Sequence, residues 1–204
     1  MALMVLDPVE ERRIKAEREA SGLDRYDEVW EGVYMMAPLA NNEHGDIQGR
    51  LASALRNAIG WREDVYVLGG ANVSDREEGW LDNYRIPDTV VVFPGAAARN
   101  CGTHWCGGPD FVAEVTSPGD RARDKLEFYA GINVRELLVI DRKPWQLELY
   151  QLEEGGLRLV GTSSLSTPDL LRSAVVSTSF RLVPGKARPR IEVTHHDGVQ
   201  RWLV

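Results

Sequence analysis

Two short apolar runs separated by a helical stretch constrain the fold of this chain most strongly. Phe111–Val115 and residues 136–140 are largely apolar and rich in residues that favour strands, and residues 121–130 between them are typical of a helix. A strand, a helix and a second strand in this order usually form a right-handed crossover between parallel strands. We therefore expect a βαβ unit at residues 110–140 and a further buried strand at residues 89–93.

The rest of the chain predicts two more helices and a series of shorter strands. Asp7 before Pro8 is typical of a capped helix start, and Gly22 is a natural stop. This first helix is mostly polar, so we expect it on the outside of the domain. A second helix follows Asn41 and Asn42, because apolar residues then recur every four positions. We expect a hairpin at residues 29–36, a long loop at 94–109, and strands near residues 64–68, 71–74, 145–151, 157–160, 178–183, 191–194 and 199–203.

The composition describes one ordinary globular domain. With 204 residues, of which 43% are hydrophobic and 27% charged, the chain is long enough for one sizeable core. We assign residues 1–204 to a single domain, with 1–23 as an appended helix and 184–204 as a C-terminal strand extension. No apolar run approaches the roughly 20 residues that span a membrane, and the N-terminus lacks the pattern of a signal peptide. We therefore expect a cytoplasmic protein without a membrane partner.

The formal net charge of −7 limits the classes of nucleic-acid-binding protein to which the chain can belong. Proteins that coat nucleic acid through charge alone are strongly basic. An enzyme that touches nucleic acid through a local basic rim is still compatible with this charge.

Three soft metal ligands lie within six residues of the predicted loop. Cys101, His104 and Cys106 invite a zinc interpretation, but structural zinc sites normally use four ligands from two separate pairs, and no second pair follows. We interpret this segment as a packed loop with reduced thiols, and its role stays open.

Asp88, Glu114 and Lys125 form the constellation with the clearest chemistry. Glu114 is an ionisable residue in an apolar strand, where a carboxylate is costly unless it is paired or binds a metal. Asp88 stands at the entry of the strand at 89–93, so the two carboxylates can approach each other if these strands are neighbours. Lys125 lies in the following helix and can reach back over the end of the Glu114 strand. Two carboxylates and a lysine are the minimal equipment for metal-dependent phosphodiester cleavage.

Several other residues are weaker candidates. His44 and Gln48 are four apart on the second helix, and Tyr129 is four residues from Lys125 on the same helix face. Glu31 is a further acid that can supply an outer metal contact. For each of these four residues an ordinary capping, surface or packing role is the competing interpretation. Motifs of serine hydrolases, P-loop enzymes, dinucleotide-binding proteins and zinc proteases are absent from the sequence.

An ordered set of motifs resembles the Uma2 family, whose members look like nucleases of the PD-(D/E)xK superfamily. The resemblance covers roughly residues 24–183. It is carried by residues 26–38 (YDEVWEGVYMMAP), His44 and the helix after it, residues 84–88 (YRIPD), 114–118 (EVTSP), 124–125 (DK), 129–131 (YAG) and 135–141 (RELLVID). It implies an α/β fold with a restriction-endonuclease-like mixed sheet flanked by helices, to which the later strands add antiparallel pairs.

The resemblance also implies roles for individual residues. Asp88 and Glu114 would be ligands of Mg²⁺ or Mn²⁺, the backbone carbonyl of Val115 would complete the shell, and Lys125 would be the catalytic lysine. Thr116 stands where the simplest superfamily pattern has lysine, so the lysine function would have moved to the helix.

The resulting hypothesis is a magnesium-dependent endonuclease that cleaves DNA as a homodimer. The alternative is a nuclease-like module that binds nucleic acid or protein without cutting, an interpretation that the negative net charge favours. The sequence does not separate DNA from RNA, and it does not indicate a target sequence.

Overall fold

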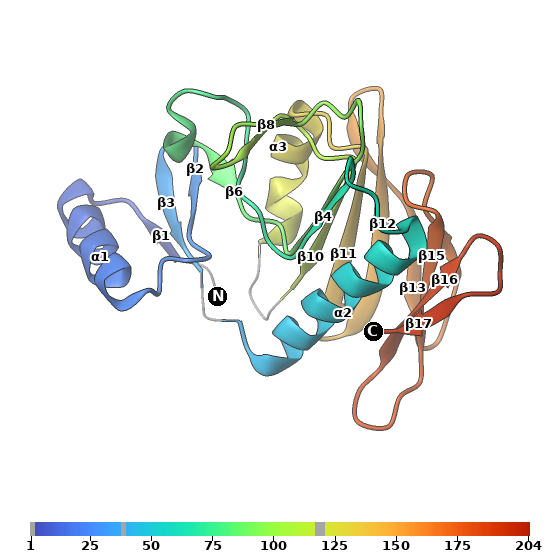
Figure 1. Cartoon of the computed structure of the whole chain (residues 1–204). Coiled ribbons are helices and arrows are strands. Elements are labelled where there is room, and N and C mark those ends of the chain that lie inside the picture. The colour runs from blue at the N-terminus through green and yellow to red at the C-terminus, as the bar shows by residue number, and fades with distance from the viewer. Residues whose placement is uncertain (1–2, 38–39, 117–120) are drawn as a thin grey trace.

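A six-stranded mixed sheet forms the centre of the computed structural model, which describes residues 3–37, 40–116 and 121–204 (Figure 1). In spatial order its strands are β13 (Gly156–Ser164), β12 (Trp145–Glu153), β11 (Glu136–Arg142), β10 (Phe111–Val115), β7 (Thr89–Val92) and β4 (Tyr66–Leu68). β10 and β11 are parallel, and the other neighbours are antiparallel. The predicted βαβ unit is therefore confirmed, and so is the buried strand before it.

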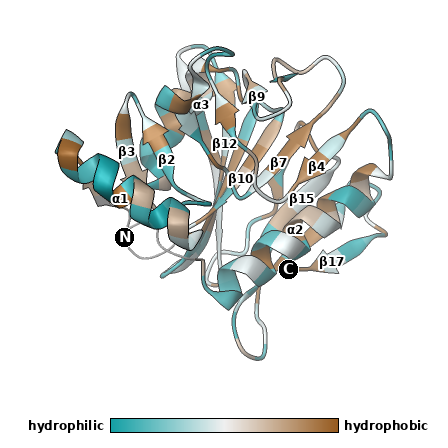
Figure 2. Ribbon diagram, turned by 60° about the vertical axis from the view of Figure 1, so that its left-hand side comes forward, coloured by the Kyte–Doolittle hydropathy of each residue, from teal (hydrophilic) through white to brown (hydrophobic). Residues whose placement is uncertain are grey.

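The two faces of this sheet carry different helices. α2 (Asn42–Ile59) begins at Asn41, whose side chain accepts a hydrogen bond from the His44 N–H at 2.9 Å. Its apolar stripe of Ile47, Leu51 and Leu55 is fully buried against one face of the sheet, and Figure 2 shows the polar and apolar residues alternating along this helix. α3 (Leu126–Gly131) packs on the opposite face through Tyr129. Because successive side chains of each strand point to opposite faces of the sheet, the buried residues form two clusters, one on the α2 side and one on the α3 side.

A sheet of short strands covers the α3 side. Within the described ranges it contains β1 (Leu3–Val5), β3 (Val33–Met36), β2 (Glu28–Trp30), β6 (Tyr84–Arg85), β5 (Val73–Ser74), β9 (Trp105–Cys106) and β8 (Arg99–Asn100), in that order. The predicted hairpin is formed by β2 and β3, with Glu31 and Gly32 at positive φ in its turn. The segment predicted as a loop at 94–109 contains β8 and β9, because two-residue strands leave no periodic signal in the sequence.

α1 (Pro8–Ser21) projects away from the rest of the molecule (Figure 1). Asp7 caps its first turn and Gly22 ends it in the left-handed conformation, as predicted. It contributes no buried residue, and Arg18 attaches it through an ion pair of 2.5 Å to Asp27, which is 2% exposed.

The C-terminal part of the chain forms a further antiparallel sheet on the α2 side. Among the described residues its strands are β14 (Leu171–Arg172), β15 (Thr178–Val183), β16 (Arg190–His195) and β17 (Arg201–Leu203). β14 is too short to be predicted. Phe180, Leu182, Ile191, Val193 and Val204 are fully buried and join the core beneath α2. None of the helices in the described part of the chain is long and apolar enough to cross a membrane.

The crossover between β10 and β11 differs from the predicted continuous helix at 121–130. A 3₁₀ turn, Ala122–Lys125, comes first, and α3 then runs only from Leu126 to Gly131. α3 ends at Gly131, and the left-handed residue beyond it is Asn133 (φ 67°). The carbonyls of Phe128, Tyr129 and Ala130 accept the hydrogen bonds that close this end of the helix. Residues 117–120, whose proline and glycine predict a break between strand and helix, lie outside the described residues.

Gly108 and Gly49 offer a matched test of this packing. A Cβ on Gly108 would lie 2.4 Å from the backbone of Asn133 and Val134, whereas one on Gly49, in the exposed middle of α2, would meet nothing within 4 Å. We expect Gly108→Ala to lower the free energy of unfolding by about 1–3 kcal/mol or more, and Gly49→Ala to raise it by roughly 0.5–1 kcal/mol. Urea unfolding followed by circular dichroism measures both changes. Equal stabilities for the two variants would contradict the close backbone approach at Gly108.

Candidate active site

Asp88 lies beside the end of β10 because β7 and β10 run antiparallel. The pair Thr89–Ala113 closes the ladder, so the residue before Thr89 faces the last residues of β10. Asp88 Oδ2 accepts a hydrogen bond from the Val115 N–H at 2.7 Å, and Oδ1 contacts His44 Nε2 at 2.7 Å. Since an ionised carboxylate only accepts hydrogen bonds, Nε2 carries the hydrogen. The neighbouring strand thus fixes one oxygen of Asp88, and α2 fixes the other.

Gln48 holds the backbone of the same residue. Its side-chain amide donates to the Asp88 carbonyl at 2.8 Å, and the Gly70 N–H donates to that carbonyl at 3.0 Å. Both accessory candidates on α2 therefore contact Asp88. His44 Nδ1 is buried without a hydrogen-bond partner among the described residues.

Glu114 faces the α3 side of the sheet, opposite to Ala113 and Val115. Its Oε1 accepts hydrogen bonds from the Tyr129 hydroxyl at 2.5 Å and from the Lys125 ammonium at 2.9 Å. Burial raises the pKa of the Glu114 carboxyl above its usual value, the positive charge of Lys125 opposes this rise, and the charges of Asp88 and Glu28 add to it. Asp88 is thus close enough for the two carboxylates to interact electrostatically.

Lys125 points into the site rather than to solvent. It is the last residue of the 3₁₀ turn, not a residue one turn inside the helix as predicted, and only 9% of its side chain is exposed. Its Nζ lies 2.8 Å from Glu28 Oε1 and 2.9 Å from Glu114 Oε1. The neighbouring Asp124 pairs with Arg121 at 2.6 Å.

Glu28 is the site residue that the sequence analysis missed. It lies on β2, in the opposing sheet, and is 6% exposed. Oε1 also accepts from the Ile86 N–H at 2.7 Å, and Oε2 accepts from the Trp30 indole N–H at 2.6 Å. The sequence carries no signal like the one at Glu114, because Glu28 opens a strand of only three residues and directly follows Asp27.

A second buried cation lies behind Glu28. Arg85, on β6, is 4% exposed, and its guanidinium lies between the rings of Trp30 (4.7 Å) and Phe128 (4.2 Å). Burial lowers the pKa of Arg85, and the charge of Glu28 opposes this. Three carboxylates and two cations from five segments of the chain therefore share this region between the two sheets.

Thr116 and Arg123 show how the lysine-bearing turn is attached. Thr116, at the position where the simplest pattern has lysine, donates through Oγ1 to Asp141 Oδ1 at 2.6 Å. Arg123 pairs with Asp141 and, at 2.8 Å, with Glu148. These ion pairs anchor the 3₁₀ turn to β11 and β12 two residues before Lys125.

Two of the predicted groups lie outside this network. Glu31 is exposed in the β2–β3 turn, where its Oε1 accepts from the Asn83 side chain at 2.8 Å. His104, between Cys101 and Cys106, uses both ring nitrogens: Nε2 contacts the Arg76 carbonyl at 3.0 Å and Nδ1 contacts the Thr103 hydroxyl at 3.1 Å. Neither group contributes to the region around Asp88.

The donor set fits a hard divalent cation. The carboxylates of Asp88 and Glu114, which come from neighbouring segments of the sheet, are oxygen ligands of the kind Mg²⁺ and Mn²⁺ prefer. Mg²⁺ is usually held by only one or two carboxylates and keeps several waters. In the described ranges no cluster of three or more His, Cys, Asp or Glu side chains is placed to hold a metal, so a closed zinc-type site does not fit these residues.

Comparison with known proteins now decides the family. A family model described as "Uma2: Putative restriction endonuclease" matches residues 18–182. The chain belongs to the Uma2 family. Among solved structures it is similar to a protein of Anabaena variabilis ATCC 29413 described as "a putative nuclease belonging to DUF820", with a TM-score of 0.54 and 15% sequence identity over 79% of this chain and 82% of that one. A search of curated proteins gives no match.

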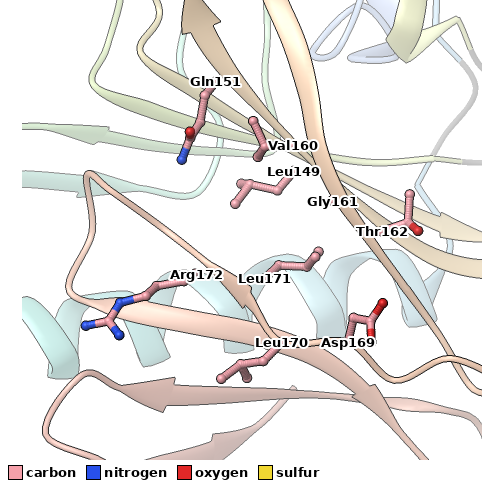
Figure 3. Close-up of a pocket in the computed structure, with 9 residues that line it drawn as sticks. All are labelled: Leu149, Gln151, Val160, Gly161, Thr162, Asp169, Leu170, Leu171 and Arg172. Atoms are coloured by element: carbon pink, nitrogen blue, oxygen red, sulfur yellow. The ribbon is translucent and has the colours of Figure 1, made fainter.

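The Uma2 membership and the structural similarity confirm the predicted α/β fold of restriction-endonuclease type. A cavity of about 340 Å³ lies elsewhere in this Uma2 protein, between β12, β13 and the segment at 169–172 (Figure 3). Its walls are formed by residues such as Leu149, Val160 and Leu171, and they include neither carboxylate of the site. We therefore place the candidate active site at Asp88 and Glu114 and not at this cavity.

The buried carboxyl of Glu114 predicts a specific dependence of stability on pH. Because its pKa is raised above the usual 4.5, the folded protein holds a proton that the unfolded chain releases, and stability falls as pH rises above that value. We expect the free energy of unfolding of the metal-free protein to lose up to about 1.4 kcal/mol per pH unit from this group. Urea unfolding in EDTA at several pH values, for wild type and Glu114→Gln, isolates the effect by difference. Parallel pH profiles would contradict it.

Proposed function

We propose that this protein is a metal-dependent endonuclease that hydrolyses phosphodiester bonds in DNA. The observation that carries the proposal is the position of Lys125, whose ammonium is held between Glu114 and Glu28 on the α3 side of the site. A lysine with only a surface role would not need a buried position between two carboxylates. The Uma2 family description supports the same chemistry.

Each residue of the site has a distinct part in this proposal. Asp88, Glu114 and the Val115 carbonyl would hold Mg²⁺ or Mn²⁺. When bound, the ion supplies activation of water and charge stabilisation at the phosphate. Lys125 orients the attacking water and offsets negative charge. Tyr129 fixes the carboxylate of Glu114 through its hydroxyl, and His44 fixes that of Asp88.

DNA is proposed as the substrate because the family description names restriction endonucleases. To cut both strands of a duplex, the protein would act as a homodimer with one site per strand. Sedimentation with and without duplex DNA measures this state.

Cleavage of plasmid DNA in Mg²⁺ or Mn²⁺ tests the proposed activity. We expect Asp88→Asn, Glu114→Gln and Lys125→Met to lower the rate roughly 100-fold or more, because each removes a charge that acts on the reacting phosphate or on the metal. Asp64→Asn and Lys186→Met remove the same kinds of group from exposed positions and should cut at the wild-type rate.

The metal requirement has a readout that does not depend on cleavage. A ligand that binds only the folded state stabilises it, by about 2.7 kcal/mol at a concentration 100 times its Kd. Mg²⁺ or Mn²⁺ should therefore raise the melting temperature of wild type but not of Asp88→Asn. If wild type cuts no DNA with either metal, the enzymatic proposal fails, and DNA binding without cutting would favour the non-enzymatic module.

A further inference from the structure

A second cavity, of about 240 Å³, lies on the same face of the central sheet as Glu114. Its walls come from Tyr66 and Leu68 on β4, from Asn72, and from the hairpin at residues 100–105. Val67 packs in the α2 half of the core, so its neighbours on β4 face the other way, as Val90, Val112 and Glu114 do. This volume is below the roughly 300–1,000 Å³ of sites for drug-sized ligands and suits a single small ring system.

One wall of this cavity offers an aromatic surface. Tyr66 is 41% exposed although it lies in a strand of the central sheet. Trp105, which is 7% exposed, packs edge-on against it with ring centroids 5.0 Å apart and fixes its orientation. An exposed ring held in this way is a surface on which any of the nucleobases can stack.

Asn72 and Asn100 in the lining carry amide groups that are held by hydrogen bonds. Asn100 Oδ1 accepts from the Gly102 N–H at 2.8 Å, which leaves its Nδ2 as a donor, and Asn72 Nδ2 donates to the Thr103 carbonyl at 3.1 Å, which leaves its Oδ1 as an acceptor. Asparagine amides pair with the edges of bases. The cavity therefore combines a stacking surface with one donor and one acceptor.

The hairpin that carries Asn100 and Trp105 is held in place by His104. Its Nε2 donates to the Arg76 carbonyl at 3.0 Å, and its ring stacks on Trp80 with centroids 4.8 Å apart and planes 13° apart. The Cys-Gly-Thr-His-Trp-Cys segment thus has a structural reason for its histidine that involves no metal. Its contacts shape the cavity wall before any ligand arrives.

The cavity lies along the segment that leads to the candidate carboxylates. The Gly70 N–H donates to the Asp88 carbonyl at 3.0 Å, and Tyr66 precedes Gly70 by four residues, at most about 14 Å along the chain. A strand of a nucleic-acid duplex rises about 3.4 Å per nucleotide. A base stacked on Tyr66 would therefore lie within about four nucleotides of a phosphate held at Asp88 and Glu114.

We propose that this cavity binds one unpaired nucleobase of the substrate, within about four nucleotides of the scissile phosphate, by stacking on Tyr66 and pairing with Asn72 and Asn100. This inference rests on the proposed nuclease function and adds a specificity-determining site to it. The base is unpaired because its hydrogen-bonding edge must face the two amides.

An abasic scan tests the proposal directly. An oligonucleotide that wild type cleaves at one position is made as a series, with a single abasic site moved one nucleotide at a time, and the cleavage rate is measured in Mn²⁺. We expect the rate to fall about tenfold or more at one position within about four nucleotides of the cut, because the stacking contact is lost there. Tyr66→Leu should flatten this profile, whereas Tyr66→Phe, which keeps the ring, should retain it.

The outcomes separate the two proposals. Cleavage with a flat wild-type profile, or a dip that persists in Tyr66→Leu, overturns the base-binding cavity and leaves the nuclease function intact. Failure to cleave any oligonucleotide overturns both. Should Tyr66→Leu fail to fold, Asn100→Ala, a change at an exposed position, takes its place. Cleavage rates are then compared for oligonucleotides that differ in the base at the position found by the abasic scan. Asn100→Ala should change the order of these rates, and an unchanged order would count against the cavity.

Discussion

The ammonium of Lys125 lies between two buried carboxylates that belong to different sheets, and much of the structure around it follows from this contact. A buried cation or carboxylate without a partner costs several kcal/mol, so neither sheet can lose its contribution without leaving a charge behind. The contact therefore fixes the distance between the sheet that carries Glu28 and the one that carries Glu114. The 3₁₀ turn between them is in turn fixed by Arg123.

Asp88 is positioned by a separate set of contacts. Its carboxylate and carbonyl are held by α2 and by the antiparallel ladder, through His44, Gln48 and Val115. The site thus combines an acid held by hydrogen bonds on one side with two carboxylates that share one lysine on the other. The charge of Lys125 offsets part of the repulsion that Asp88 and Glu28 exert on Glu114 in the metal-free state.

The central strands and the two main carboxylates could be predicted because they leave strong local signals. Glu114 interrupts an apolar run, and Asp88 precedes one. Glu28 and Arg85 could not be placed, because their roles depend on how a sheet of short strands folds over the central one, and strands such as β5 and β6 are only two residues long. The division of the predicted helix into a 3₁₀ turn and α3 was missed for a related reason, because the ion pairs that hold the turn join Arg123 to Asp141 and Glu148 on strands distant in sequence.

The attachment of α1 has a consequence for shortened forms of the protein. The helix buries none of its residues, so its removal would cost almost no apolar contact. Arg18, however, donates to both oxygens of Asp27 and to the Ala37 carbonyl, and Asp27 also accepts from Tyr34 and from the Ala37 N–H. Removal of residues 1–21 would delete Arg18. The buried carboxylate of Asp27, next to the strand that begins at Glu28, would then lack its cation. The apparently dispensable N-terminal helix thus supplies a counter-ion for the sheet, and its deletion would affect the region where Lys125 is held.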